Sequence, residues 1–146
     1  MRKSLSLSRG FTLVEIMIVV AIVGIITAIA YPSYENYITR SKRSDGMGAL
    51  MNAAQAIERY KVNNYNYNVG TDLGQIFATQ VPVDGGNAYY NLTVRSNNTS
   101  YTLTATPTGS MAGKDGALTV THTGARTWTD KDGTLHNCWP ESGNSC

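Results

Sequence analysis

The sequence predicts an α+β protein in which one long N-terminal helix packs on a small antiparallel sheet of about three to four strands. Residues 11–63 carry apolar side chains either continuously or at helical spacing. After Tyr89, short segments alternate apolar and polar residues between turn residues, which is typical of strands with one buried face. The apolar stripe of a helix is the natural cover for the apolar face of such a sheet.

The first half of the predicted helix is long enough to cross a membrane. Residues 11–31 contain one ionisable side chain, Glu15, and as a helix they would span about 31 Å. The core of a bilayer is about 30 Å thick. Arg2, Lys3 and Arg9 precede the run, which predicts that this end of the chain stays in the cytoplasm. We therefore interpret residues 11–31 as a transmembrane helix.

The start of this helix predicts a cleavage site. Gly10 directly precedes the apolar run, and Glu15 lies one turn inside it, where a buried charge costs about 2.5–3.5 kcal/mol. A cut after Gly10 would remove residues 1–10 as a leader and make Phe11 the new amino terminus. The ammonium group freed in one copy could then neutralise the Glu15 carboxylate of another copy.

These residues resemble the start of a type IV pilin, with the order Gly-Phe-Thr-Leu-Val-Glu, a short basic leader, an apolar run and then Pro32. The resemblance implies that a prepilin peptidase cuts between Gly10 and Phe11, that Phe11 is N-methylated, and that Glu15 sets the register of assembly. Residues 11–31 would become the core of a fibre.

The resemblance also implies the partners and the location of the protein. Its partners would be other pilin subunits, the peptidase and methyltransferase, an inner-membrane assembly platform and, before assembly, the lipid bilayer. The chain would be a single-pass inner-membrane protein at first and part of a cell-surface pilus afterwards. Such a pilus would serve adhesion, twitching motility or DNA uptake.

Two other interpretations of the N-terminal segment stay open. A secretory signal peptide combines a basic start, an apolar run and a small-residue exit, and Ala28-Ile29-Ala30 supplies such an exit. The early position of Glu15 and the length of the run count against this interpretation. The segment could also be a plain membrane anchor.

The second half of the predicted helix, residues 32–63, is amphipathic. Its apolar stripe includes Tyr37, Met47, Leu50, Ala54, Ile57 and Tyr60. The polar and basic segment 40–46 interrupts the stripe just beyond the membrane-length run. This segment would face lipid headgroups, the acidic groups of a neighbouring subunit, or solvent.

Gly24 and Pro32 are expected to soften the helix where its two halves join. Glycine costs about 1 kcal/mol relative to alanine, and proline removes a backbone donor. In the resembled family this part of the helix loosens when subunits enter the fibre. An ordinary proline kink, which requires no function, is an equally good interpretation of the residues alone.

Residues 64–146 are predicted to form a globular β head. A turn-rich connection over residues 65–87 leads to runs of alternating residues, of which the first two form a hairpin: 90–94, 101–105, 118–120 and a fourth around Trp128. The head resembles that of minor pilins in outline, from Ala88 to Cys138-Trp139. Many of those proteins carry a cysteine where this chain has Asp115. Cys138 and Cys146 fit one disulfide in an oxidising compartment.

No catalytic or metal-binding constellation is visible in the sequence. His122 and His136 are the only histidines, and His136-Asn137-Cys138 offers too few ligands for a metal site. A glycine-rich phosphate loop joined to a strand and a helix is also missing. We therefore expect no enzymatic activity, no cofactor and no metal ion.

Charge gives no support to binding of a polyanion. Removing the leader lowers the basic side chains from 12 to 9 against 10 acidic ones, so the processed side chains sum to about −1. Arg95, Lys114, Arg126 and Lys131 are scattered along the head. Two alternatives to a pilus subunit stay open. They are a pseudopilin of a type II secretion system and a surface module that binds DNA or a receptor.

Overall fold

The computed structural model describes residues 10–141 and residue 146. Leader residues 1–9 and loop residues 142–145 lie outside the described part, so the predictions that fall on them are not tested. The chain divides into two compact units, of which the first ends at Asn36 and the second is Tyr37–Cys146. The long helix α1 (Leu13–Asn64) begins in the first unit and ends in the second.

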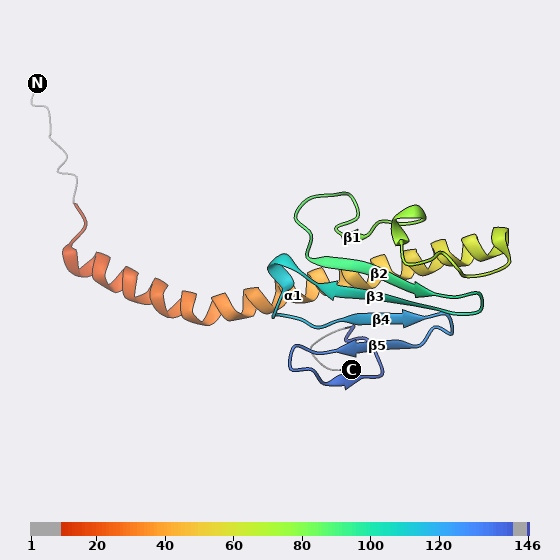
Figure 1. Cartoon of the computed structure of the whole chain (residues 1–146). Helices are drawn as coiled ribbons and strands as arrows, with labels where there is room; N and C mark the ends of the chain where they lie inside the picture. Colours follow the sequence, from red (N-terminus) through yellow and green to blue (C-terminus); the bar gives the residue numbers. More distant parts are fainter. Residues whose placement is uncertain (1–9, 142–145) are drawn as a thin grey trace, which may run out of the picture. The chain divides into compact units, whose positions relative to one another are not determined.

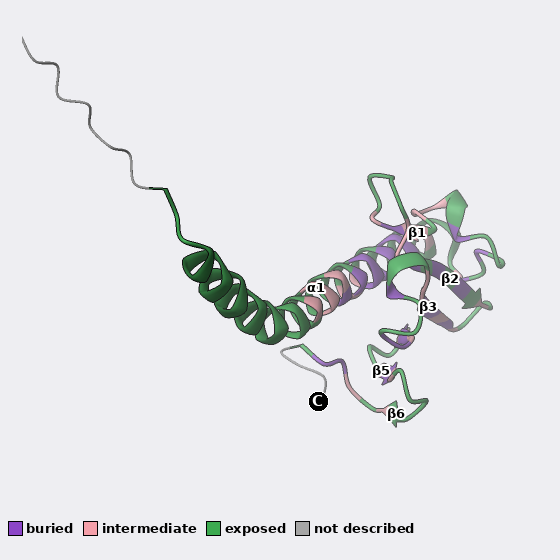
Figure 2. Ribbon diagram, turned by 90° about the vertical axis from the view of Figure 1, so that its left-hand side faces the viewer, coloured by how far each residue is buried: buried purple, intermediate pink, exposed green. Residues whose placement is uncertain are grey.

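The large apolar side chains in the first half of α1 are exposed. Figure 2 shows this half of the helix as exposed throughout, and the first buried residue of α1 is Arg43. By length and composition α1 is the one helix among the described residues that could cross a membrane. Its apolar surface therefore needs lipid or other protein chains to cover it.

The head is built on one antiparallel sheet of six strands in sequence order (Figure 1). The strands are β1 (Gln80–Val81), β2 (Tyr90–Ser96), β3 (Tyr101–Pro107), β4 (Leu118–Thr121), β5 (Arg126–Thr129) and β6 (Leu135–His136). The prediction of three to four strands was therefore wrong in number. The two extra strands, β1 and β6, contain two residues each, which is too short for an alternating pattern to show.

The predicted faces of the main strands are confirmed. Along β2 the buried residues are Tyr90, Leu92 and Val94, and β3 buries every second residue in the same way. Opposite them, α1 contributes a stripe of mostly small residues: Gly46, Ala49, Leu50, Ala53, Ala54, Ala56 and Ile57. Small side chains let the helix lie close to the sheet. A Cβ atom at Gly46 would lie 3.2 Å from the Tyr90 ring.

The predicted helix stripe starts later than expected. Leu50, Ala54 and Ile57 are buried as predicted, whereas Tyr37 is 69% exposed. The connection over residues 65–87 is also more ordered than predicted, because it contains β1 and the 3-10 turn η1 (Leu73–Gln75). Tyr67, Val69 and Leu73 anchor this connection in the core of the head. A second 3-10 turn, η2 (Gly109–Met111), follows β3.

Candidate functional site

The residues predicted for cleavage and register lie at the start of α1. Gly10 and Phe11 precede the helix, and the Phe11 side chain is 81% exposed. The Glu15 backbone N–H donates to Thr12 Oγ1 at 3.2 Å, and the Thr12 N–H donates to Glu15 Oε2 at 3.4 Å. This reciprocal pair is a capping box, in which a threonine and a glutamate three residues later satisfy free N–H groups at a helix start. Glu15 therefore has a role within its own chain that the sequence interpretation overlooked.

Gly24 and Pro32, the residues predicted to soften the helix, both lie within the helical part of α1. Between them, the Thr27 hydroxyl donates to the Val23 carbonyl oxygen at 2.7 Å. Side-chain bonds of this kind compete with the backbone ladder and often accompany bending. The softening role stays a prediction.

In the described part of the head, the buried charged residues Arg43 and Asp115 form a network centred on Asp115. The Arg43 guanidinium donates from Nε to Asp115 Oδ2 and from Nη2 to Oδ1, both at 2.8 Å. Trp128 Nε1 donates to Oδ1 at 3.1 Å, and the Tyr90 hydroxyl donates to Oδ2. The Asp115 side chain has no exposed surface and that of Arg43 is 3% exposed. The network therefore joins α1 to three separate segments of the head.

The backbone next to Asp115 lies against β5. A Cβ atom at Gly116 would overlap the carbonyl oxygen of Thr129, so only glycine allows this close approach. Burial, assisted by the hydrogen bond to Asp115, raises the pKa of the Tyr90 hydroxyl far above its usual value. Tyr90 therefore stays a neutral donor to the carboxylate.

A groove lies between α1 and strands β3, β4 and β5, and we call it the α1–β4 groove. It has a volume of about 450 Å³. Its lining includes apolar surface from Met51, Ala54, Tyr101 and Val120, together with Gln55, Glu58, Arg59, Thr121, His122, Gly124 and Arg126. The groove thus combines an apolar floor with a charged rim.

Hydroxyl and ammonium groups surround Glu58 at one end of this groove. The Tyr67 hydroxyl lies 3.2 Å from both carboxylate oxygens of Glu58, and the Tyr101 hydroxyl donates to Oε1 at 3.3 Å. Burial, followed by the charge of Glu58, raises the pKa of Tyr101 to about 12. Lys61 Nζ donates to the Tyr67 hydroxyl at 2.9 Å, and this bond raises the pKa of the lysine.

The two histidines lie apart from each other. His122 contacts the rings of Tyr67 and Tyr101, with ring centroids 6.3 and 6.4 Å away. His136 stacks on Trp128 and lies 3.0 Å from Asp130, where its hydrogen bond lowers the pKa of that carboxyl. Within residues 10–141 and 146, no group of three His, Cys, Asp or Glu side chains is placed to hold a metal ion.

The C-terminal segment is closed by a disulfide and held on the sheet through Trp139. Cys138 and Cys146 form a disulfide. The Trp139 indole N–H points to the carbonyl oxygens of Thr119 and Thr127, at 2.9 and 3.2 Å. The Arg126 guanidinium lies over the Trp139 ring, 4.9 Å from its centroid.

Comparison with known families finds two matches in this chain. Residues 32–121 match the family model described as type IV minor pilin ComP, DNA uptake sequence receptor. Residues 5–31 match the model of the prokaryotic N-terminal methylation motif.

Among curated proteins, a type IV major fimbrial protein FimA of Dichelobacter nodosus is 34% identical over 143 residues. The match covers 91% of this chain and 89% of that protein. A second FimA of the same organism is 57% identical over 53 residues, which is 36% of this chain and 34% of that one.

Among solved structures, the minor pilin PilV of Neisseria meningitidis is similar with a TM-score of 0.50 and 18% identity. The match covers 76% of this chain and 99% of PilV. A type IV pilin of Shewanella oneidensis is 24% identical with a TM-score of 0.47, over 60% of this chain and 89% of that one.

Proposed function

The chain belongs to the type IV pilin family, with a head of the minor pilin ComP type, and we propose that it is cut after Gly10 and assembled through residues 11–31. It is a structural subunit that assembles with other pilin subunits. In this proposal the new amino terminus is N-methylated Phe11, and Glu15 of one subunit pairs with the Phe11 ammonium of an adjoining one. The subunit has no catalytic role.

The observation that carries this proposal is the combination of the start motif with an uncovered apolar helix. Val14, Ile18 and Ile25 are each more than half exposed, as are most of their large apolar neighbours. So much exposed apolar surface is not stable in water. A bilayer covers it before assembly, and the helices of other subunits cover it in a fibre.

In this proposal the subunit is inserted in the inner membrane before it enters the pilus. The basic leader keeps the amino end in the cytoplasm, and residues 11–31 hold the subunit as a single pass in the inner membrane. The prepilin peptidase and methyltransferase act there, and an assembly platform passes the subunit into the pilus. The head, 64–146 with the second half of α1, then lies on the cell surface.

The first test is the mass of the N-terminal peptide of the protein purified from its native membrane. N-methylated Phe11 is the expected terminus, and a Gly10→Val variant should keep residues 1–10. A terminus at Tyr31 would contradict the proposal, because the apolar run would then be a discarded signal peptide.

A second function is supported by the family match, whose description names a DNA uptake sequence receptor. We propose that the head also binds duplex DNA. From Tyr37 onward the chain has nine basic and eight acidic side chains, so binding would have to come from a local cluster and not from net charge.

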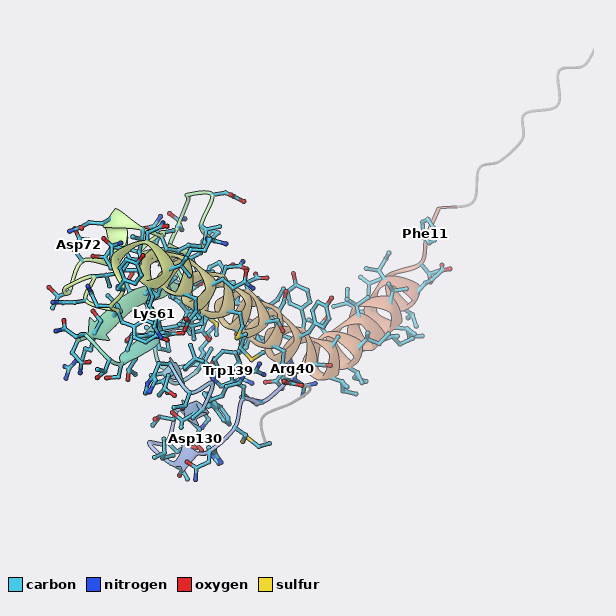
Figure 3. All side chains as sticks on the ribbon, turned by 90° about the vertical axis from the view of Figure 1, so that its right-hand side faces the viewer. Phe11, Arg40, Lys61, Asp72, Asp130 and Trp139 are labelled. Carbon is cyan, nitrogen blue, oxygen red and sulfur yellow. A yellow bond between two sulfur atoms is a disulfide. The ribbon has the colours of Figure 1, made fainter. Side chains whose placement is uncertain are left out.

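Lys61 and Arg95 are the best placed cations for this role. Neither has an ion-pair partner among the described residues. Tyr67, which contacts Lys61, donates its backbone N–H to the Asn98 carbonyl oxygen in the β2–β3 turn, and Arg95 is the second-last residue of β2, just before that turn. Both cations therefore lie at the end of the head where α1 finishes, and Figure 3 shows Lys61 at that end and Arg40 at the other.

We expect duplex DNA to bind the intact protein in detergent with an affinity that falls as salt rises, measured by fluorescence anisotropy. The slope of the logarithm of the binding constant against the logarithm of the salt concentration counts the phosphates that the protein neutralises. A Lys61→Gln or Arg95→Gln variant should reduce the size of this slope by about one for each phosphate that the wild-type side chain neutralises. Lys131→Gln is the matched control, because Lys131 is already paired with Asp132 at 3.0 Å. Equal effects of all three substitutions would contradict a binding site at this end.

A further inference from the structure

The α1–β4 groove is an unfilled apolar surface in the head. Its volume is about 450 Å³, and an apolar side chain that entered it would release water from the apolar walls. The walls come from α1 on one side and from β3, β4 and β5 on the other. Both walls belong to the unit Tyr37–Cys146.

The charge left available on the rim of this groove is positive. Arg59 has no ion-pair partner among the described residues. Arg126 contacts Glu141 at 3.4 Å, but the Glu141 side chain is 74% exposed and such pairs are weak. The one acidic group of the rim, Glu58, already accepts from Tyr67 and Tyr101. An occupant should therefore bring an apolar side chain and a negative charge.

The chain itself carries a segment with these two features. Among the described residues of the unit Tyr37–Cys146, five large apolar side chains are exposed: Tyr37, Val62, Tyr65, Val83 and Leu135. Tyr37 has Arg40 one turn away, and Val62 and Tyr65 lie beside Lys61. Leu135 follows the Lys131–Asp132 ion pair. Val83 alone has an acidic neighbour, Asp84, with no basic residue close to it in the sequence.

Val83 and Asp84 form the corner of a tight turn. The Gly85 N–H donates to the Pro82 carbonyl oxygen at 3.3 Å, and Gly85 and Gly86 have φ angles of +95° and +106°. Glycine adopts such angles without strain. Val83 is 47% exposed, and Asp84 has no ion-pair partner among the described residues. A turn that already holds its shape loses little conformational entropy on binding.

The turn and the groove lie on opposite sides of the head. The turn follows β1 at one edge of the sheet, whereas the groove is lined by β3, β4 and β5 toward the other edge (Figure 1). They also lie at different levels along α1, because the turn is near Ser44–Ala49 and the groove is near Met51–Arg59. A contact between two different surfaces repeats head to tail, as a closed ring or as an open helical filament, and does not form a two-fold dimer. With the helices of successive subunits parallel, the difference in level shifts each copy along the fibre axis, so the contact repeats as an open filament.

We propose that the Val83–Asp84 turn of one head enters the α1–β4 groove of the next copy of the same chain, with Asp84 facing Arg59. This inference rests on the proposed function as a pilus subunit and extends it. A head that carries both surfaces of one contact can bind one copy of itself through the turn and another through the groove, so the contact can repeat along a fibre. The chain is therefore suited to form the shaft of a fibre and not only to occupy single positions in a fibre of another pilin.

Disulfide cross-linking in assembled fibres tests the contact. In a chain with both Val83→Cys and Gln55→Cys, oxidation of sheared fibres should give a ladder of covalent multimers that disappears on reduction. The matched control pairs Gln55→Cys with Leu135→Cys, which places an exposed apolar position from the β6 edge in the same assay. Fibres that give no ladder, or equal ladders from both pairs, would overturn the proposal.

Charge reversal provides an independent readout. Asp84→Arg should reduce the amount of sheared fibre about tenfold, because each junction would place two cations together. Adding Arg59→Asp to the same chain should restore fibre yield by reversing the pair. The head itself should keep its thermal stability, since Asp84 makes no ion pair within the described residues. Failure of the second substitution to restore the yield would contradict the Asp84–Arg59 contact.

The two proposals fail in different ways. If the unmodified chain is not cut after Gly10 and gives no fibre, the proposed function is wrong and the head contact with it. If processed fibres form normally and neither the cysteine pair nor the charge pair has an effect, only the head contact is wrong.

Discussion

Replacing Asp115 by alanine is expected to lower the free energy of unfolding of the head by about 3–5 kcal/mol. Asp115 accepts hydrogen bonds from Arg43, Tyr90 and Trp128, and its side chain is completely buried. The substitution would remove the carboxylate that accepts two hydrogen bonds from the buried Arg43 guanidinium. It would also leave the donors of Tyr90 and Trp128 without an acceptor, and buried polar groups without partners are costly.

Urea unfolding of the intact protein in detergent, followed by Trp fluorescence, measures this effect. Glu141→Ala is the matched control, because its exposed pair with Arg126 should contribute no more than about 1 kcal/mol. Adding Arg43→Met to Asp115→Ala should recover part of the stability, since it removes a buried charge that has lost the Asp115 carboxylate. A decrease no larger than that of Glu141→Ala would show that the Asp115 network contributes little to stability.

The parts of the fold that could be predicted from the sequence are those encoded by local periodicity. The helical spacing of Leu50, Ala54 and Ile57 and the alternation along β2 and β3 report burial directly, and the structure confirms both. The start motif is local as well, and the family matches confirm the pilin prediction that was based on it. The Thr12–Glu15 capping box was also readable, because its signal is a threonine followed three residues later by a glutamate.

The parts that could not be predicted depend on contacts between distant segments. Arg43 and Asp115 are 72 residues apart in sequence, and neither has a neighbour that marks it as buried. The segment 40–46 was interpreted as facing lipid, a neighbour or solvent, whereas Arg43 in fact turns into the head. The α1–β4 groove likewise exists only because α1 and β4 come together, and no single stretch of sequence encodes it.

Replacing Glu15 by glutamine or alanine is expected to leave cleavage after Gly10 intact and to reduce fibre yield at least about tenfold. The physical reason is that an unpaired Phe11 ammonium would lie in an apolar fibre core, where even lenient scales set the cost of a charge at about 2.5–3.5 kcal/mol. Cleavage is unaffected because the cut occurs four residues earlier, before any neighbouring subunit is bound. N-terminal mass spectrometry of membranes and quantification of sheared fibres measure the two effects separately.

Two variants are needed because Glu15 has two proposed roles. It caps the start of its own helix, and it pairs with the Phe11 ammonium of a neighbouring subunit. Glutamine can keep the hydrogen bond to the Thr12 N–H but lacks the charge, so Glu15→Gln removes only the register role. Thr12→Ala is the complementary control, since it removes the cap at a cost of about 1 kcal/mol and keeps the carboxylate. If the charge sets the register, Glu15→Gln loses fibres and Thr12→Ala keeps them. If Thr12→Ala loses as many fibres as Glu15→Gln, Glu15 acts by starting the helix, and subunit register must come from the heads.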